Sequence, residues 1–487
     1  MENKFDNLFA FVLGREQKIA RAELESVLRH FYFYFDKNNP ELNRRMDFSI
    51  LSLTGNVILI NIERGEDFLK SDIMSVLGGT MEIYQIIAMA DSLDPDIIYS
   101  QISHLSEGFS HRVTFGISDY SKTFTEAKIN TLGLDVKKKL KKNISARFVA
   151  ERGDTHLSSA AIISNRLHKD GLLLGIFSHN NQYLIGKLIG ATNPNEWSKR
   201  DFGKPKSDRF AGMCPPKLAR MIINLALGST KMSKFKVQNP NQVQSSKSKK
   251  EFDIWNLDFG IPQHEVLVVD PFCGSGNILI EALALGCEVI GSDVSEKAVD
   301  NTKANLNWLN NELGIMNNGS KNLNHDSLFD IHNSIFQADA TKFDFTKKLE
   351  ANKSRCDGAD RDPDISESSG LRSYVIVTEP YLGQPKKFKP TLNAVKGEYS
   401  KVKRLYVEFL KNVSGIKYQV SCIGIVFPLV ETVEGKQFSL FSECIDEIKE
   451  IGYTLMCEPF VYGRDYQVVK RQIAFFKQQD TSDNNQT

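Results

Sequence analysis

The sequence predicts an α/β fold, with a doubly wound domain in the C-terminal half of the chain and an α+β region before it. From residue 265 onwards, strand-like and helix-like segments alternate strictly, and strand-like runs such as VLVVD and YVIV are continuously apolar. Such runs are expected where helices cover both faces of a parallel sheet. From residue 8 to about 190, short β-rich runs alternate with amphipathic helices, which indicates an α+β region.

Length and composition indicate several domains in one chain. With 487 residues, 41% of them hydrophobic, the chain is too long for one ordinary core and apolar enough for two or three. We expect domains at 1–100, 101–192 and 193–478, and a disordered tail at 479–487. Polar stretches predict insertions into the third domain near 230–262, 314–330 and 350–372.

The individual elements follow from the spacing of the apolar residues. In the α+β region we expect strands at 9–14, 56–62, 111–118, 145–150, 172–177 and 183–190, and helices at 18–32, 67–78, 132–143 and 157–171. In the doubly wound domain we expect strands at 265–270, 288–293, 334–339, 373–381, 421–430, 455–462 and 471–477, and helices at 277–286, 295–314, 398–413 and 441–452.

Charge is distributed unevenly along the chain, although the formal net charge is only +1. Residues 101–250 carry 26 basic and 10 acidic side chains, whereas residues 1–100 carry 10 and 16, and residues 251–487 carry 25 and 34. A concentrated positive block in a neutral protein predicts a docking surface for a polyanion. The alternative interpretation is a solvated face together with a basic linker.

Several classes of protein are not expected. No apolar run reaches the length of a membrane span, and charges flank the short FAFVL segment near the N-terminus, so we expect neither an anchor nor a signal peptide. The seven cysteines are scattered and contain no CxxC pair, and the nine histidines lack ligand spacing. We therefore expect reduced thiols, a cytoplasmic location and no metal site.

A glycine loop follows the first strand of the doubly wound domain, in VVDPFCGSGNILIEAL, residues 268–283. A dinucleotide fingerprint needs a small residue three positions after the second glycine, but Leu279 stands three positions after Gly276. No GK[ST] follows, which excludes a Walker loop. The acid at the strand end, Asp270, would repel a phosphate and accept hydrogen bonds from an ammonium group. The loop therefore favours a cofactor with a positively charged amino-acid end.

Two further acids stand at the next two strand ends. Asp293 can accept hydrogen bonds from both ribose hydroxyls, and Asp339 can accept one from an adenine amine. Together with Asp270, these acids outline an amino acid, a ribose and a base, which predicts S-adenosyl-L-methionine as the cofactor. The alternative is an ordinary glycine turn with two helix caps.

These residues resemble the class I methyltransferase fold, which is Rossmann-like, and the glycine loop resembles that of enzymes that methylate exocyclic amines. Residues 200–226, RDFGKPKSDRFAGMCPPKLARMIINLA, resemble the segment before the cofactor loop in the THUMP-domain tRNA (guanine-N2) methyltransferases that modify guanosine 10. FAFVLGREQKIARAELESVL resembles the N-terminus of that family. HRVTFGISDY, LGLDVKKKLKK and LSSAAIISNRLHKDGLLLGIF resemble its THUMP region.

The resemblance implies a role for each matching residue and domain. Residues 1–100 would form a ferredoxin-like domain, residues 101–192 a THUMP domain that binds tRNA, and residues 193–478 the methyltransferase domain. The expected cofactor-binding residues are Asp270, Phe272, Gly274, Gly276, Asp293 and Asp339.

The motif VTEPYLG, at the end of the fourth expected strand, occupies the place where the family has Asp-Pro-Pro-Tyr or a close variant. The resemblance implies that Glu379 and the carbonyl of Pro380 accept the hydrogens of the target amine, while Tyr381 stacks on the flipped base. This chain has Glu for Asp and lacks one proline, which leaves the methylated atom open. The alternative interpretation is a strand end with Tyr381 in the core.

The basic residues and the partners follow from the same resemblance. Expected tRNA contacts are Lys137, Lys138, Lys141, Lys199, Arg200 and Arg209. The expected function is tRNA methylation at N2 of a guanosine, with position 10 favoured. The need for a small activating partner subunit and the oligomeric state stay open. Two alternatives are a methyltransferase acting on adenine N6 or guanine N2 of DNA or rRNA, and an RNA-binding module with a degenerate site.

Overall fold

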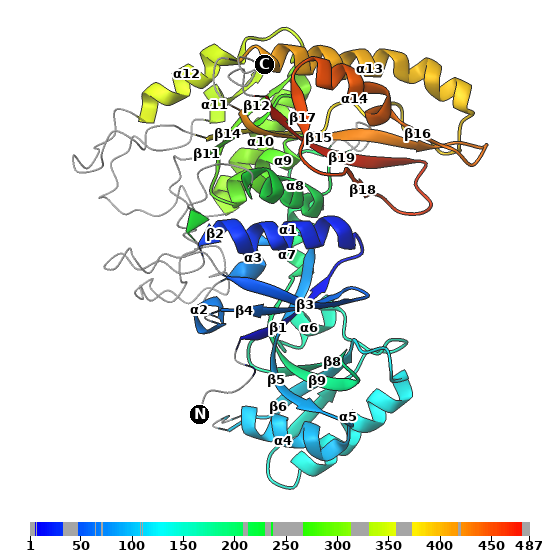
Figure 1. Cartoon of the computed structure of the whole chain (residues 1–487). Coiled ribbons are helices and arrows are strands. Elements are labelled where there is room, and N and C mark those ends of the chain that lie inside the picture. The colour runs from blue at the N-terminus through cyan, green and yellow to red at the C-terminus, as the bar shows by residue number, and fades with distance from the viewer. Residues whose placement is uncertain are drawn as a thin grey trace, which may run out of the picture. The chain divides into compact units, whose positions relative to one another are not determined.

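The computed structural model describes residues 5, 7–32, 47–63, 65–69, 72–107, 109, 111–207, 213–228, 235–236, 266–312, 331–356, 373–416 and 420–479. Arg209 and the predicted insertion near 314–330 lie outside the described residues. So do most of the other two predicted insertions and all of the predicted tail except Gln479. The chain divides into two compact units, Met1–Trp197 and Ser198–Thr487 (Figure 1).

The first unit is built on one eight-stranded sheet with the strand order β3-β4-β1-β5-β9-β8-β6-β7. The strands of this sheet are β1 (Leu8–Leu13), β3 (Phe48–Thr54), β4 (Val57–Ile62), β5 (Thr80–Ala90), β6 (Val113–Asp119), β7 (Ala146–Val149), β8 (Leu172–His179) and β9 (Gln182–Ala191). The unit also contains β2 (Phe31–Tyr32), which lies outside this sheet. Its helices are α1 (Gln17–His30), α2 (Gly65–Leu69), α3 (Ile73–Val76), α4 (Pro95–Leu105), α5 (Glu126–Leu140), α6 (Ser159–Ser164) and, across the boundary of the two units, α7 (Pro194–Phe202).

This sheet is continuous across residue 100. Strand β5 pairs antiparallel with β1 on one side and with β9 on the other, so that Ile83 lies opposite both Phe11 and Gly190. One buried core, which includes Ala10, Tyr84 and Leu173, draws on residues from both sides of residue 100. The predicted division at residue 100 therefore lies inside one sheet and one core.

Several elements of this unit, among them β3, β5, α4 and α7, have no counterpart in the sequence-based prediction. The β5 segment TMEIYQIIAMA has a buried glutamate, Glu82, among its apolar residues and does not alternate regularly. The hydroxyls of Tyr84 and Tyr120 both donate to this carboxylate at 2.5 Å, which satisfies it inside the core. The α4 start is marked by Asp94, whose side chain accepts from two backbone amides of the first turn.

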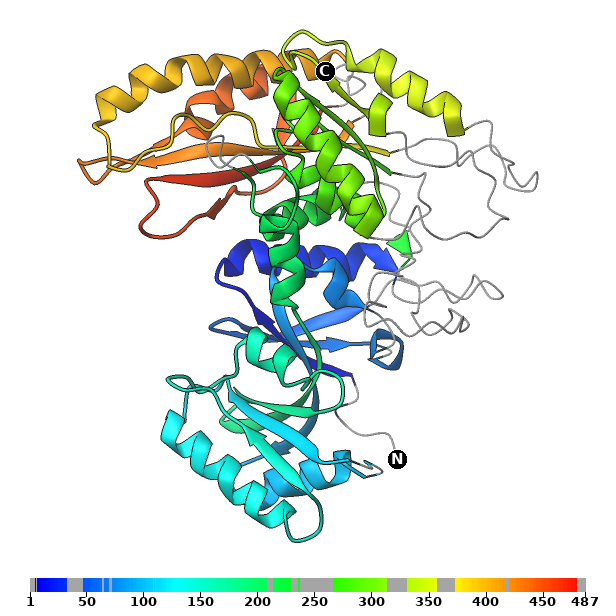
Figure 2. The ribbon, with the colours of Figure 1, turned by 180° about the vertical axis from the view of Figure 1, so that it is seen from behind.

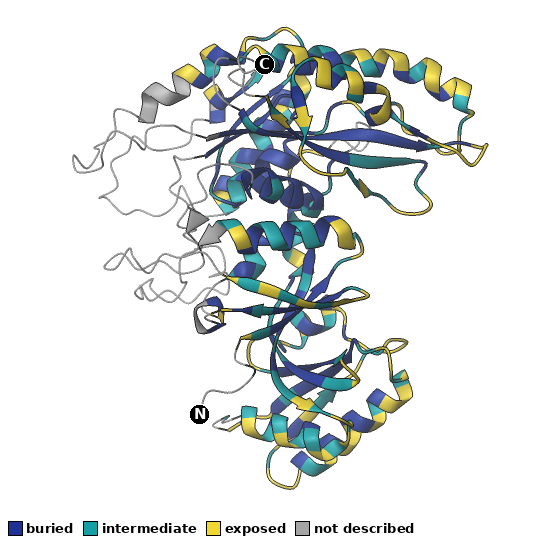
Figure 3. Cartoon of the chain, in the orientation of Figure 1, coloured by how far each residue is buried: buried dark blue, intermediate teal, exposed yellow. Residues whose placement is uncertain are grey.

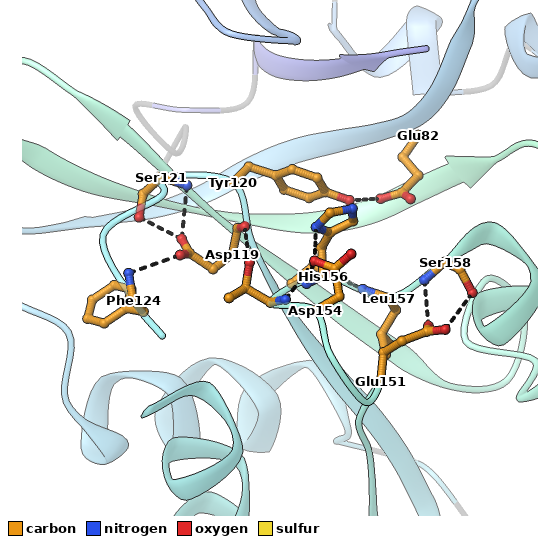
Figure 4. A network of polar contacts seen from close by, with 12 residues as sticks. Glu82, Asp119, Tyr120, Ser121, Phe124, Glu151, Asp154, His156, Leu157 and Ser158 are labelled. Atoms are coloured by element: carbon orange, nitrogen blue, oxygen red, sulfur yellow. Dashed lines mark hydrogen bonds and ion pairs between the residues drawn. The ribbon is translucent and has the colours of Figure 1, made fainter. Parts of the chain in front are cut away.

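The loops after β6 and β7 are held by a network of side-chain to backbone hydrogen bonds (Figure 4). The Asp119 carboxylate accepts from the amides of Ser121 and Phe124, at 2.9 and 3.2 Å. The Glu151 carboxylate accepts from the amide and the hydroxyl of Ser158. These bonds replace the secondary-structure partners that loop amides lack.

The second unit contains the strands β10 (Phe235–Lys236), β11 (Val266–Asp270), β12 (Glu288–Asp293), β13 (Ile335–Gln337), β14 (Ser373–Thr378), β15 (Val420–Glu431), β16 (Gln437–Ser439), β17 (Tyr453–Leu455), β18 (Phe460–Tyr462) and β19 (Val469–Gln478). Its helices are α8 (Pro216–Gly228), α9 (Asn277–Ala284), α10 (Glu296–Glu312), α11 (Ile331–Ser334), α12 (Phe345–Cys356), α13 (Leu392–Ser414) and α14 (Leu440–Glu450).

The main sheet of this unit has the order β13-β12-β11-β14-β15-β19-β17, and its first five strands are parallel. Strand β19 is antiparallel to β15 and β17. The central strand β11 places Val268 between Val289 of β12 and Val375 of β14. The chain moves outward in one direction from β11 to β13 and in the other from β14 to β15. The predicted doubly wound fold is confirmed, and the strand order reverses between β11 and β14.

Helices cover both faces of this sheet, as its apolar strands require (Figures 1 and 2). Helices α13 and α14 pack on one face, and α8, α9 and α10 on the other. The α13 residues Val395, Tyr399, Val402 and Tyr406 recur at helical spacing and are buried, while the opposite side of the helix is exposed (Figure 3). The strand predicted over 455–462 is divided in two, because residues 456–459 lie between β17 and β18.

Candidate active site

The carboxyl ends of the parallel strands meet at one edge of the second unit's sheet, where the strand order reverses and open α/β sheets bind ligands. A cavity of about 200 Å³ opens there. Five residues predicted from the sequence line it: Asp270, Phe272, Gly274, Asp293 and Glu379. These residues come from β11, β12 and the segments that follow β11 and β14, so the topology brings together side chains that lie far apart in the chain.

The loop between β11 and α9 depends on two glycines. Gly274 and Gly276 have φ angles of 54° and 83°, in the left-handed region that L side chains rarely adopt. At Gly276 an added Cβ would lie 3.0 Å from Cγ2 of Thr302, whereas an added Cβ at Gly274 would face open space. The backbone at Gly274 is therefore accessible to a ligand in the cavity.

Asp270 is a buried carboxyl at the end of β11. Its Oδ1 accepts hydrogen bonds from Thr378 Oγ1 at 2.6 Å and from the Phe272 amide at 3.2 Å. Burial raises the pKa of the Asp270 carboxyl to about 7; the hydrogen bonds oppose this shift, and the charges of Asp293 and Glu379 add to it. A cation in the cavity would favour the ionised form of Asp270.

Asp293 joins the end of β12 to the glycine loop. Its Oδ2 accepts from the Gly274 amide at 3.0 Å and its Oδ1 from the Ser295 amide at 2.9 Å. Each carboxylate oxygen has a second lone pair. Asp293 therefore fixes the loop while keeping capacity to accept hydrogen bonds from a ligand.

Glu379 is held by a residue that sequence reasoning missed, Arg471 of β19. The guanidinium donates from Nε to Oε2 at 2.7 Å and from Nη2 to Oε1 at 3.1 Å, and Nη2 also donates to the Met213 carbonyl at 3.0 Å. Burial alone would lower the pKa of Arg471, but the Glu379 carboxylate raises it above its ordinary value. No local signal in RQIAFFK marks this arginine, because its partner lies 92 residues away.

Residues that precede helix α8 in the chain also hold the glycine loop in place. The Asn277 side chain donates to the Cys214 carbonyl at 2.7 Å and accepts from Lys204. Burial lowers the pKa of Lys204 to about 8. Asn305 donates to the carbonyls of Ser275 and Lys206, both at 2.8 Å. Lys204 and Cys214 are thus tied to the loop directly, and Lys206 is tied to it through Asn305.

A buried charge cluster anchors helix α9. The Glu281 carboxylate, which is fully buried, pairs with Arg200 of α7 at 2.7 Å and with Arg220 of α8 at 2.6 Å. The Arg200 side chain is only 6% exposed. A side chain this buried cannot easily reach a phosphate, which argues against the tRNA contact predicted for Arg200. Arg200 instead helps to join α7, α8 and α9 through Glu281.

The other predicted residues lie outside the lining of this cavity in the described chain. Asp339 bonds within its own loop, where hydrogen bonds from Thr341 and Lys342 lower its pKa to about 2. Pro380 is buried, and Tyr381 is 45% exposed, so the prediction's alternative of Tyr381 in the core is wrong.

The predicted tRNA-contacting lysines lie in two places. Lys138 and Lys141 are exposed, at the end of helix α5 and just after it, and Lys137 is half-buried. Lys199 pairs with Glu312 of α10. The described residues contain no group of three or more His, Cys, Asp or Glu side chains placed to hold a metal ion. Within the same residues, no helix combines the length and apolarity needed to cross a bilayer.

The sheet order and the glycine loop at the switch point are those of the class I methyltransferase fold, as the sequence predicts. No family model matches the chain. Over 39 residues, the chain is 49% identical to the tRNA (guanine(10)-N2)-dimethyltransferase of Methanothermobacter thermautotrophicus. This match covers 8% of the chain and 12% of that relative's length. The predicted resemblance to tRNA (guanine-N2) methyltransferases is confirmed over this short segment.

Solved structures give more distant likenesses. TrmN from Thermus thermophilus is 11% identical with a TM-score of 0.42, over 97% of this chain and 99% of that one. The magnesium protoporphyrin IX methyltransferase from Synechocystis PCC 6803, solved with SAH, is 11% identical with a TM-score of 0.25, over 45% of this chain and 76% of that one. Neither likeness bears on the function of this chain.

Proposed function

We propose that this protein methylates the N2 amine of a guanosine in tRNA, with S-adenosyl-L-methionine as the methyl donor and position 10 as the favoured target. The observation that carries the proposal is the shared cavity: the Glu379 carboxylate at the end of β14 lines the same space as Asp270, Asp293 and the glycine loop. The short match to a tRNA (guanine(10)-N2)-dimethyltransferase supports the choice of substrate.

The residues of the cavity fit the proposed cofactor. Asp270 is a buried carboxyl close to two other carboxyls, and a positively charged group would relieve the cost of ionising it. Gly274 faces open space, which leaves room for a ligand against the backbone. Asp270 and the glycine loop would hold the amino-acid end, and Asp293 the ribose. When bound, the cofactor supplies an electrophilic methyl group.

Glu379 would serve as a hydrogen-bond acceptor for the target amine. The lone pair of an exocyclic guanine amine is delocalised into the ring, so acceptors must draw its hydrogens out of the plane before nitrogen becomes nucleophilic. Arg471 occupies one lone pair on each Glu379 oxygen and leaves one on each for the base. The Pro380 carbonyl would accept the second amine hydrogen, and the exposed ring of Tyr381 would stack on the flipped base.

We propose that residues 101–192 dock the tRNA through the basic end of helix α5. Lys138 and Lys141 are exposed there, next to Lys137, and each phosphate that a lysine neutralises releases counterions and adds affinity. Asp339 is proposed to contact the adenine. We also propose a cytoplasmic location. Assays of the protein purified alone will reveal any requirement for a small activating subunit.

The test is methyl transfer from labelled S-adenosyl-L-methionine to unmodified tRNA, mapped by nuclease digestion and mass spectrometry. We expect N2-methylguanosine at a defined position. For Glu379→Gln we expect a loss of about 10²–10³ in rate, because one preorganised acceptor oxygen is replaced by an NH2 group that cannot accept. DNA and rRNA are assayed beside tRNA.

Each outcome of this test decides between specific alternatives. Methylation of DNA or rRNA but not of tRNA would replace the proposed substrate. Cofactor binding without transfer to any nucleic acid, with and without added cell extract to supply a subunit, would refute the proposed activity. Glu379→Gln must retain cofactor binding, since a variant that has lost it would not report on the acceptor role.

A further inference from the structure

A ten-residue loop, YLGQPKKFKP at 381–390, connects Glu379 and Pro380 to helix α13. It begins at the carboxyl end of β14, the edge of the sheet where the cavity opens. The loop is rich in lysine and aromatic residues. The function proposed above uses only its first residue, Tyr381.

The first part of the loop is fixed by contacts with α13. The Tyr399 hydroxyl, on a buried side chain, donates to the Leu382 carbonyl at 2.8 Å. Gly383 has a φ of 90°, and a Cβ there would lie 2.4 Å from the Tyr399 oxygen. Only glycine therefore allows the chain to turn this closely over the tyrosine.

The lysines at either end of the basic stretch are held by ion pairs. Lys386 pairs with Glu398 of α13 at 2.5 Å, and Lys389 pairs with Glu431 of β15 at 2.9 Å. The Val433 amide donates to the Pro390 carbonyl at 3.0 Å. The carboxylates of Glu398 and Glu431 thus each pair with a lysine of the loop, and these contacts hold the loop against α13 and β15.

Between these anchors, the loop presents one apolar and one charged side chain to solvent. The Phe388 side chain is 84% exposed, and the neighbouring Lys387 is also exposed. Phenylalanine gains stability from burial, so a phenylalanine displayed on an anchored loop contributes little to the fold. An exposed aromatic ring beside a lysine is the combination that binds single-stranded nucleic acid, by stacking on a base and pairing with a phosphate.

We propose that residues 385–389 bind the nucleotide next to the methylated one, with Phe388 stacked on its base and Lys387 on its phosphate. This inference rests on the proposed function, in which Tyr381 takes the flipped base. The tRNA strand would then pass from Tyr381 to Phe388 along one loop. The neighbouring base, unstacked when the target flips out, gains a new aromatic partner, which offsets part of the cost of flipping.

The test measures the affinity of full-length protein for unmodified tRNA, together with the salt dependence of binding. Phe388→Ala is expected to weaken binding by about 5- to 150-fold, the effect of losing one stacked base. Phe388→Tyr, which keeps the ring, should bind within about twofold of wild type. Lys387→Ala should reduce the slope of log affinity against log salt by about 0.7–0.9.

Lys411→Ala is the matched charge control, because Lys411 is an exposed lysine in the last turn of α13, at the other end of that helix from the loop. It should bind tRNA as wild type does. The melting temperatures of all these variants should agree within a degree or two, since the substituted side chains are exposed.

The outcomes separate this inference from the proposed function. If wild type methylates tRNA and Phe388→Ala binds it as tightly as wild type, the inference is wrong and the proposed function stands. If wild type binds tRNA without methylating it, and Phe388→Ala weakens binding while Phe388→Tyr does not, the loop is an RNA contact and the proposed activity is wrong. If wild type does not bind tRNA, both are overturned.

Discussion

Both carboxylate oxygens of Glu379 accept hydrogen bonds from one guanidinium, that of Arg471, at 2.7 and 3.1 Å. A bidentate pair fixes the plane of the carboxylate as well as its position. The same guanidinium donates to the Met213 carbonyl. An acceptor aimed in this way does not have to reorganise when charge develops on the target nitrogen.

Replacing Arg471 should therefore damage catalysis more than binding. For Arg471→Met we expect a decrease in kcat of about 10²-fold, because a small misplacement of a reacting group has an effect of that size. Arg471→Lys should recover only part of the rate, since an ammonium group cannot pair with both oxygens in one plane. Steady-state methyl transfer at saturating tRNA and S-adenosyl-L-methionine measures kcat. An unchanged kcat in Arg471→Met would show that catalysis does not depend on Arg471 orienting the Glu379 carboxylate.

The raised pKa of Asp270 predicts that cofactor affinity depends on pH. The proposed cationic ligand prefers the ionised carboxyl, so affinity should rise with pH through about 7, where Asp270 ionises in the free protein. Isothermal titration between pH 5.5 and 8.5 measures this. Asp270→Asn should bind weakly and lose the dependence, and a wild-type affinity that is flat with pH would contradict the prediction.

The same group affects stability with a definite sign. Because the folded pKa of about 7 lies above the ordinary value of 3.8, folding favours the protonated form. The stability that this group contributes is full below about pH 4 and is lost as pH rises through about 7. Unfolding in urea, with wild type compared to Asp270→Asn at each pH, isolates this contribution from those of other groups.

The Glu281 cluster predicts a large loss of stability from one substitution. Glu281→Gln leaves Arg200 and Arg220 buried without their carboxylate, which typically destabilises a protein by about 3–5 kcal/mol. The matched control is Glu408→Gln, which breaks an exposed pair with Arg404 on α13 and should change stability far less. Urea unfolding measures the free energy of unfolding of both variants. Similar decreases in the two would mean that the buried cluster stabilises the fold no more than the exposed pair does.

The two glycines of the loop between β11 and α9 should respond differently to alanine. Both have positive φ, so either substitution strains the backbone by about 1–2 kcal/mol. Gly276→Ala also crowds Thr302, whereas Gly274→Ala adds a methyl group to open space at the cavity. We expect Gly276→Ala to lower the melting temperature more, and Gly274→Ala to lower cofactor affinity more. Thermal unfolding and titration, done on both variants, check the contrast.

The sequence was sufficient to predict much of the site because strand ends are easy to locate. Asp270 and Asp293 each follow an apolar run, and parallel strands bring their carboxyl ends to one edge. The same rule predicted Glu379 beyond β14. Phe272 and Gly274 lie in the loop that the glycines mark, and all five line the cavity.

The roles that the sequence did not predict depend on contacts between residues that lie far apart in the chain. Arg471 reaches Glu379 only because β19 inserts antiparallel next to β15, with Arg471 opposite Pro428. Asn277 and Cys214 meet through packing of α8 on α9, which no periodicity encodes. Arg200 lies in a basic segment and was therefore predicted to contact phosphate. In the structure it pairs with Glu281, a buried glutamate on another helix.

Because β5 pairs with β9, the first unit cannot be divided at residue 100 without breaking its sheet. A cut at residue 100 would separate β5 from β9, so that each fragment would present an unpaired strand edge to solvent. Such edges pair with other chains and promote aggregation. Residues 101–192, which we propose to dock the tRNA, therefore could not fold as a separate module with their sheet complete.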